Sequence, residues 1–188
     1  MNILSIKNTL SIILPVILTF ATTKVLAQPT VQWDKTYGGN NYESMRSAFK
    51  TQDEGFLLVG QTESAANGAD ITQPARGYSD YFVVRIDSLG TKLWDKRYGG
   101  DTTDLCYKAI QNTEGYLLIG ISFSGKTGDK TDINRGNGDF WLVQIAPDGT
   151  KLYAQSIAIK GVKHPVVTDF FGSLDKQKIG RASCRERV

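Results

Sequence analysis

The sequence predicts an all-β protein built from two copies of a four-stranded repeat. Blocks of sequence recur at a spacing of about 60 residues, which indicates a repeated structural unit. Short apolar runs have the length of buried strands, and glycine, proline and aspartate separate them as in turns. After the first 27 residues, no stretch keeps the apolar period of a helix.

The first 27 residues have the three zones of a secretory signal peptide. Lys7 precedes an apolar run from Leu10 to Phe20, and Val25-Leu26-Ala27 forms a cleavage site. A membrane anchor is the alternative, but Pro15 interrupts the run, which is shorter than the ~20 apolar residues that cross a bilayer. We therefore expect an exported protein, cleaved after Ala27, with no integral membrane span after cleavage.

The repeat is visible as matched blocks of sequence. The offset between matched blocks is 61, then 60, then 59, and it changes only between blocks. Loops absorb such single-residue changes whereas paired strands do not, so the drift locates the loops. The blocks are Trp33–Gly39 with Trp94–Gly100, Glu54–Gly60 with Glu114–Gly120, Arg76-Gly77 with Arg135-Gly136, and Asp80–Val84 with Asp139–Val143.

Each copy predicts four short strands. The second and third strands contain continuous apolar runs, such as Phe56-Leu57-Leu58-Val59 and Tyr81-Phe82-Val83-Val84, which indicate burial on both faces. The expected strands are 44–51, 56–62, 81–87 and 92–98 in the first copy, and 105–112, 116–122, 140–146 and 151–157 in the second.

Turn residues separate these strands. Gly55 and Gly115 stand where a hairpin needs a positive φ angle. The segments Asp87-Ser88-Leu89-Gly90 and Ala146-Pro147-Asp148-Gly149 fit type I turns with glycine at the fourth position. We expect the connections 63–79 and 123–138 to be loops.

Four-stranded sheets repeated along a chain are typical of a β-propeller, in which ~4–8 blades surround a channel. We expect propeller repeats over residues 28–160, with blade 1 at about 44–98 and blade 2 at about 105–157, and a decayed or partial third repeat over 161–178. Trp33–Tyr37 resembles the last strand of a blade that is otherwise missing, and Lys151–Ile157 is alternatively the first strand of a third blade. Because at least three repeats are normally needed for stability, the sequence predicts an incomplete ring and a fragment.

Each copy has the motif Trp-Asp-Lys-x-Tyr-Gly-Gly, followed by the block that begins at Glu54 or Glu114 and the block that begins at Asp80 or Asp139. This pattern resembles that of a known family over roughly residues 31–152. The chain is similar to secreted propeller-repeat proteins of Bacteroidetes-type bacteria, many of which end in a type IX secretion sorting domain. The resemblance implies a secreted or surface protein without a defined activity. Two departures are Ala154-Gln155-Ser156 in place of Asp-Lys-x, and the absence of a sorting domain.

The last ten residues, Ile179–Val188, resemble a translated sequencing adapter, because the codons ATC GGA AGA GCG TCG TGT AGG GAA AGA GTG encode all ten. The alternative is a basic disordered tail of the kind that contacts nucleic acid. The net charge of the chain is +3, of which residues 1–27 contribute +2 and residues 179–188 contribute +2, so residues 28–178 carry −1. We therefore expect a non-native tail and no nucleic-acid partner.

Repetition separates structural from functional residues, because a recurring residue serves the fold while a functional group is needed once. Asp80 and Asp139 recur, so we expect them to accept hydrogen bonds in turns rather than to form a catalytic pair. The recurring aromatics are expected in the core between blades: Trp33, Trp94, Tyr153, Phe82 and Trp141. Specificity carried by loops would lie among residues that do not recur, such as Tyr78, Pro74, Phe123 and Cys106.

The remaining chemical features are incomplete motifs. Thr131–Asp139 has alternating oxygen ligands but lacks the distal glutamate of a calcium loop, so a solvated loop is the alternative. Gly125–Gly128 has only part of a phosphate loop, and a turn is expected. His164 has no second histidine or cysteine for a metal and no nucleophile elbow nearby. Since Cys184 lies in the adapter-like tail, Cys106 is expected to be a buried hydrophobe and not part of a disulfide.

We therefore expect no catalytic residue, metal or cofactor, and the sequence defines no binding residue. The leading hypothesis is a secreted or cell-surface, non-catalytic module for binding or structural scaffolding, with carbohydrate or a cell-surface protein as candidate partners. The alternative is a fragment of a secreted propeller-containing enzyme, glycan-active or quinone-dependent, whose catalytic part lies elsewhere. The ligand, the blade number and the oligomeric state are not predicted by the sequence.

Overall fold

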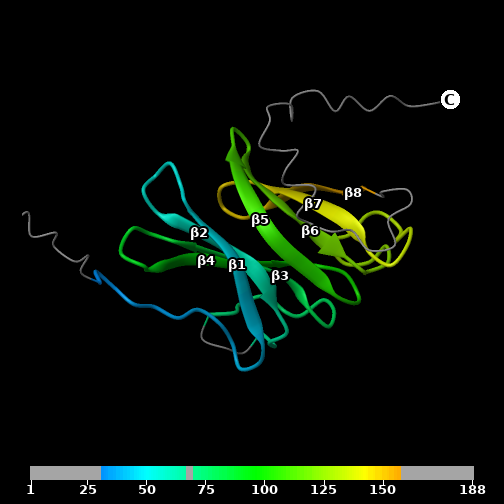
Figure 1. The fold of residues 1–188 in the computed structure, drawn as a ribbon, viewed down its shortest axis with the longest axis horizontal. Helices are drawn as coiled ribbons and strands as arrows, with labels where there is room; N and C mark the ends of the chain where they lie inside the picture. The colour runs from blue at the N-terminus through cyan, green and yellow to red at the C-terminus, as the bar shows by residue number, and fades with distance from the viewer. Residues whose placement is uncertain (1–30, 67–69, 158–188) are drawn as a thin grey trace, which may run out of the picture. The chain divides into compact units, whose positions relative to one another are not determined.

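The computed structural model describes residues 31–66 and 70–157. The chain divides between Gln32 and Trp33 into two units, and the structure described below is that of the second. Within these ranges the protein is all-β, with two four-stranded antiparallel sheets and no helix (Figure 1). Accordingly, this part of the chain has no helix that is long and apolar enough to span a membrane.

Each sheet is formed by strands in sequence order, so every strand pairs with the next one along the chain. The first sheet contains β1 Glu43–Lys50, β2 Phe56–Thr62, β3 Asp80–Ile86 and β4 Lys92–Tyr98; the second contains β5 Asp104–Asn112, β6 Gly115–Ser122, β7 Asp139–Ile145 and β8 Lys151–Ile157. The strands β2, β4 and β8 have the predicted bounds, and the other five differ from prediction by one residue at one or both ends.

The outer segments have different outcomes. Lys151–Ile157 pairs with β7 as the fourth strand of the second sheet, which confirms the main prediction and makes the alternative, the first strand of a third blade, wrong. Trp33–Tyr37 is irregular rather than a strand and pairs with none of the described strands. Its side chains hold it instead: the Trp33 indole donates to the carbonyl of Ser88 at 3.1 Å, and the Tyr37 hydroxyl donates to that of Gly90.

The turns follow the sequence with one exception. Gly90 and Gly149 are the fourth residues of turns, as predicted: each donates its N–H to the carbonyl three residues earlier, and their φ angles are 77° and 81°. In the β5–β6 hairpin Gly115 has the predicted positive φ, 132°. The prediction for Gly55 is wrong, because Glu54 takes the left-handed conformation, with φ 66°. Glycine at position 55 is needed for space, since a Cβ there would overlap the Arg85 guanidinium and the Ile86 carbonyl.

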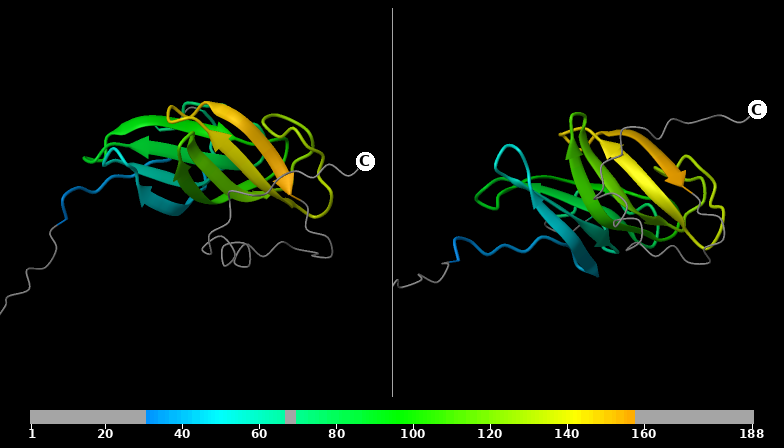
Figure 2. Two further views of the ribbon diagram at one scale, coloured as in Figure 1. Left: turned by 90° about the horizontal axis from the view of Figure 1, so that it is seen from above. Right: turned by 45° about the horizontal axis from the view of Figure 1, so that its top comes forward.

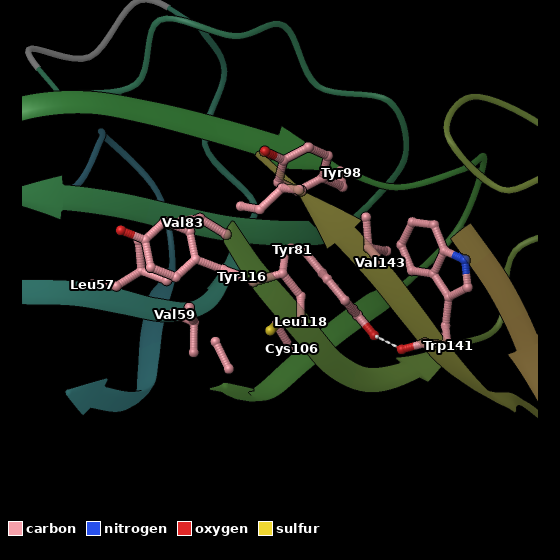
Figure 3. Packing of buried hydrophobic residues seen from close by; sticks show 12 residues of the cluster. Leu57, Val59, Tyr81, Val83, Tyr98, Cys106, Tyr116, Leu118, Trp141 and Val143 are labelled. Atoms are coloured by element: carbon pink, nitrogen blue, oxygen red, sulfur yellow. Dashed lines mark hydrogen bonds between the residues drawn. The ribbon is translucent and has the colours of Figure 1, made fainter. Parts of the chain in front are cut away.

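The main apolar core lies between the two sheets (Figure 3). Tyr81 of β3 is central to it: its ring centroid is 4.8 Å from that of Trp141, and its hydroxyl donates to the Trp141 carbonyl at 3.0 Å. Figure 2 shows the two sheets from two further directions. The buried members are Leu57, Val59, Tyr81, Val83 and Tyr98 from the first sheet and Cys106, Ala109, Tyr116, Leu118, Trp141, Val143 and Ile145 from the second.

A smaller core covers the other face of the first sheet. Phe82, Val84 and Ile86 of β3 pack there with Ile71, and Trp33 and Tyr37 lie against them. Every residue of β3 is therefore buried, as its continuous apolar run predicts. Such two-sided burial makes β3 the most enclosed strand of its sheet.

The recurring aromatics differ in how far they are buried. Trp141 is fully buried and Trp94 partly buried in the core between the two sheets, as predicted. Phe82 is fully buried and Trp33 partly buried, but they lie in the smaller core on the other face of the first sheet. The prediction for Tyr153 is wrong, since it is 52% exposed. Trp33 and Trp94 lie on turns of the sheet that follows them, beside Gly90 and Gly149 respectively. No sheet follows β8 within the described residues, so Tyr153 has no such surface.

Candidate functional site

The Trp-Asp-Lys-x-Tyr-Gly-Gly motif forms the same interface twice. In each copy the tyrosine hydroxyl and the next glycine N–H donate to a turn and a loop of the sheet that follows the motif, so the motif contacts that sheet in the same way twice. The matched bonds are Tyr37 to the Gly90 carbonyl and Tyr98 to the Gly149 carbonyl, the latter at 2.5 Å, and Gly38 to Asp70 Oδ2 and Gly99 to Asp129 Oδ2, both at 3.3 Å.

A buried ion pair lies beside this interface. Arg97 Nη2 is 2.8 Å from Asp80 Oδ2, and both side chains are fully buried. Arg97 also donates to the Ser64 carbonyl at 2.5 Å. Asp80 accepts a hydrogen bond from the Arg76 N–H at 3.0 Å, as expected of a turn-capping residue. Its pairing with Arg97 was not predicted from the sequence.

The second sheet supplies its cation from another place in the repeat. Ser156 stands where the first copy has Arg97, and Lys130 stands where it has Ile71. The Lys130 ammonium donates to the Ser124 carbonyl at 2.9 Å and lies 3.7 Å from Asp139 Oδ2. Asp139 also accepts from the Arg135 N–H at 3.1 Å, as predicted. The cation that faces the recurring aspartate therefore comes from strand β4 in the first copy and from the loop between β6 and β7 in the second.

A second carboxylate, Asp104 of β5, lies near Asp80. Its Oδ2 accepts hydrogen bonds from the Gly100 N–H and the Ser124 hydroxyl, both at 2.8 Å. Burial raises the pKa of both carboxyls, and the negative charge of Asp80 contributes to the rise at Asp104. Neither side chain is accessible to solvent.

The oxygens of the polar loop Thr131–Asp139 are bound within the protein. Asp132 accepts from the Ser156 N–H at 2.7 Å, and Asn134 accepts from the Gly136 N–H at 3.1 Å. In residues 31–66 and 70–157, no group of three or more histidine, cysteine or acidic side chains is placed to hold a metal ion. The loop is held by hydrogen bonds within itself and to β8.

The other sequence candidates have structural roles or lie outside the described residues. Gly125–Gly128 forms a turn, as predicted, in which the Thr127 N–H donates to the Gly125 carbonyl at 3.0 Å. Cys106 is fully buried, and burial raises the pKa of its thiol to about 12, so it is a neutral core residue. His164, the signal-like segment and the adapter-like tail lie outside the described residues.

The non-recurring loop residues are exposed. Tyr78 is 69% and Phe123 39% exposed, and Pro74 is also on the surface. The N–H of Tyr78 donates to the Thr102 carbonyl at 2.8 Å, and that of Phe123 to the Thr103 carbonyl at 2.9 Å. The backbones of these two aromatics are thus bonded to adjacent residues of the β4–β5 connection, and their side chains are exposed.

The end strands β1 and β5 carry a matched irregularity that was not predicted from the sequence. The pairing register shifts between Met45 and Ser47 and between Cys106 and Lys108. Arg46 and Tyr107 are therefore the extra residues of two β-bulges, at the same repeat position. Bulges redirect a side chain and are frequent beside functional sites.

The two bulge residues meet, because β1 and β5 lie side by side (Figure 1). The guanidinium carbon of Arg46 is 5.1 Å from the centroid of the Tyr107 ring, a cation–π contact. Arg46 Nη2 also donates to Gln61 Oε1 at 3.5 Å. Arg46 is exposed and Tyr107 half-buried. We call Arg46, Tyr107 and Gln61 the bulge site.

A signal for the bulge site is present in the sequence. Arg46 and Tyr107 occupy equivalent repeat positions but differ in kind, which is the property expected of a functional residue in a repeat. The bulges themselves could not be predicted, because a register shift depends on the partner strand and not on the residue alone.

A scan against protein-family models finds no matching family, and a search of the curated proteins finds no matching protein. The repeated interface and the bulge site are therefore the basis for a functional proposal.

Proposed function

We propose that this chain is an exported β-propeller-type module that binds a ligand or serves as a scaffold at the cell surface or outside the cell, without catalysing a reaction. The interface that the Trp-Asp-Lys-x-Tyr-Gly-Gly motif forms twice carries the proposal. An interface that repeats in this way can be extended by further sheets of the same kind, as in the blades of a propeller.

The absence of catalysis is supported by the use of the buried polar groups. Asp80 and Asp139 each contact a buried cation of their own copy, and Asp104 Oδ2 accepts hydrogen bonds from the Gly100 N–H and the Ser124 hydroxyl. These groups are used inside the fold. The residues left for a partner are exposed ones, such as Tyr78, Phe123 and Arg46.

Export is proposed from the signal-like residues 1–27 and from the resemblance to secreted repeat proteins. Expression of the full chain in a bacterium with a general secretion pathway tests it. Intact-mass measurement of the exported product should give a chain that begins at Gln28. Retention of the uncleaved chain in the cytoplasm would contradict export.

The binding function is tested with the purified full chain on an array of neutral and acidic glycans. We expect retention of a glycan without turnover, so product analysis by mass spectrometry should find the bound glycan intact. Release of shortened glycans, or reduction of a dye when quinone cofactor is added, would favour the alternative of a secreted enzyme.

A further inference from the structure

We infer that the bulge site binds the carboxylate of an acidic saccharide, with Arg46 as the residue that contacts it. The inference rests on the proposed binding function and gives that function a ligand chemistry. It depends on how Arg46 is held, on the charges around it, and on the groups that β1 and β5 present beside it.

Arg46 is held in place without being neutralised. Arg76, Arg85 and Arg97 each pair with an aspartate, whereas Arg46 has an aromatic ring and an amide as its partners among the described residues. A guanidinium whose face lies on a ring keeps its N–H donors, which lie in its plane, available at its edge. That planar fork matches the two oxygens of a carboxylate.

The exposed charges of the two strands have one sign. Arg46, Lys50 and Lys108 are the exposed charged residues of β1 and β5, and all three are cations. The acidic residues of these strands are engaged inward: Glu43 accepts from the Thr62 hydroxyl at 2.7 Å, and Asp104 is buried. Lys50 is paired with Glu54, so the attraction of an anion to these strands is assigned to Arg46.

The other groups beside the bulge site suit sugar hydroxyls. Ser44 and Ser47 are uncharged polar residues of the same strand as Arg46 and are half-exposed. Because β1 and β5 stand at the ends of their sheets, each also presents backbone N–H and C=O groups that no strand of its own sheet pairs. An acidic saccharide offers both a carboxylate and hydroxyls, whereas a simple anion uses only the guanidinium.

The test is a titration of the isotopically labelled full chain with trigalacturonate, followed by NMR through the Arg46 Nε–H signal. Arg46→Gln should weaken binding by about tenfold or more, and Arg46→Lys by about threefold to tenfold, because lysine keeps the charge but loses the fork. Tyr107→Leu should weaken it by about threefold through loss of the ring that holds the guanidinium.

Lys50→Gln is the matched control, because Lys50 is an exposed cation of the same strand that already pairs with Glu54. It should change affinity by less than about twofold. Unchanged thermal unfolding midpoints of the Arg46 variants establish that they fold.

Neutral galactotriose and acetate separate the possible sources of binding. Both should bind about tenfold or more weakly than trigalacturonate, since galactotriose has no carboxylate and acetate has no sugar hydroxyls. Acetate binding as strong as that of trigalacturonate would overturn the saccharide assignment. Unchanged trigalacturonate binding by the Arg46→Gln variant would show that the site is not at Arg46, while the proposed binding function would stand. Failure of every anion to bind would overturn the inference. Cleavage of trigalacturonate would instead contradict the proposed function.

Discussion

The buried aspartates Asp80 and Asp139 are each paired with a cation, and this cation comes from a different position in each copy of the repeat. Arg97 approaches Asp80 from β4, whereas Lys130 approaches Asp139 from the loop between β6 and β7. Both cations also donate to the backbone carbonyl at the matched position, Ser64 or Ser124. A buried carboxylate needs such a partner because desolvation of an isolated charge is costly. The buried aspartate therefore needs a cation at one position in space, and either the strand or the loop can supply it.

Loss of this partner gives the first prediction at the residue scale. Arg97→Met should lower the free energy of unfolding by about 3 kcal/mol, because it leaves the Asp80 carboxylate buried and uncompensated. Urea denaturation measures the change. Combining it with Asp80→Asn should cost less than the sum of the two single substitutions, and strict additivity would contradict the pairing.

The carboxyl of Asp104 predicts a dependence of stability on pH. Burial raises its pKa above the ordinary 3.8, so the folded protein keeps the proton to higher pH than the unfolded chain does. The stability contributed by the protonated form is present below about pH 4 and is lost as the pH rises through the raised pKa.

Asp104→Asn removes this titration and keeps one oxygen to accept the Gly100 N–H. Its free energy of unfolding should fall less than that of the wild type between pH 4 and pH 7. Urea denaturation at the two pH values measures both proteins. Equal losses would show that Asp104 is not responsible.

At the scale of elements, a glycine stands opposite each bulge. Gly60 pairs with Met45 and Gly120 with Cys106, the residues just before the bulges. A Cβ at Gly60 would overlap the Ser44 carbonyl, and one at Gly120 would overlap the Leu105 carbonyl. The end strand therefore approaches its neighbour too closely for any side chain at these two positions.

Gly120→Ala should accordingly destabilise the protein by about 1–3 kcal/mol, since the overlapping atom belongs to the backbone and cannot rotate away. Gly136→Ala is the control, because a Cβ there would meet nothing within 4 Å. Differential scanning calorimetry compares the two variants. Similar midpoints for both would argue against the close approach.

At the scale of the whole molecule, the sheets are linked by a segment that ends one copy and packs on the next. Trp94 belongs to β4 of the first sheet, yet it contributes to the core between the sheets and lies beside Gly149 of the second. Tyr153 has the equivalent position in β8 and is half exposed. The same motif position therefore contributes to stability only where a sheet follows.

These two residues form a matched pair for the last prediction. Trp94→Ala should cost about 2 kcal/mol, less than the ~3–5 kcal/mol of a fully buried tryptophan because it is only partly buried. Tyr153→Ala should cost less than about 0.5 kcal/mol, as for other exposed positions. Urea denaturation of both variants measures the difference, and equal losses would contradict the repeated interface.

The sequence by itself determined the local features of this protein. The strands from β1 to β8 and the turns at Gly90 and Gly149 were predictable, because apolar runs and glycines that take positive φ act over a few neighbouring residues. The repeat also indicated that Asp80 and Asp139 accept hydrogen bonds in turns, since the aspartate is present at the same position in both copies.

The tertiary structure decided what each recurring segment contacts. Trp33–Tyr37 and Tyr153 carry the same motif as β4, but their pairing and burial depend on whether another strand or sheet lies beside them. The cation for each buried aspartate, the two bulges and the meeting of Arg46 with Tyr107 were likewise decided there. The physical reason is that register, ion pairing and packing are interactions between distant segments, so one segment alone does not specify them.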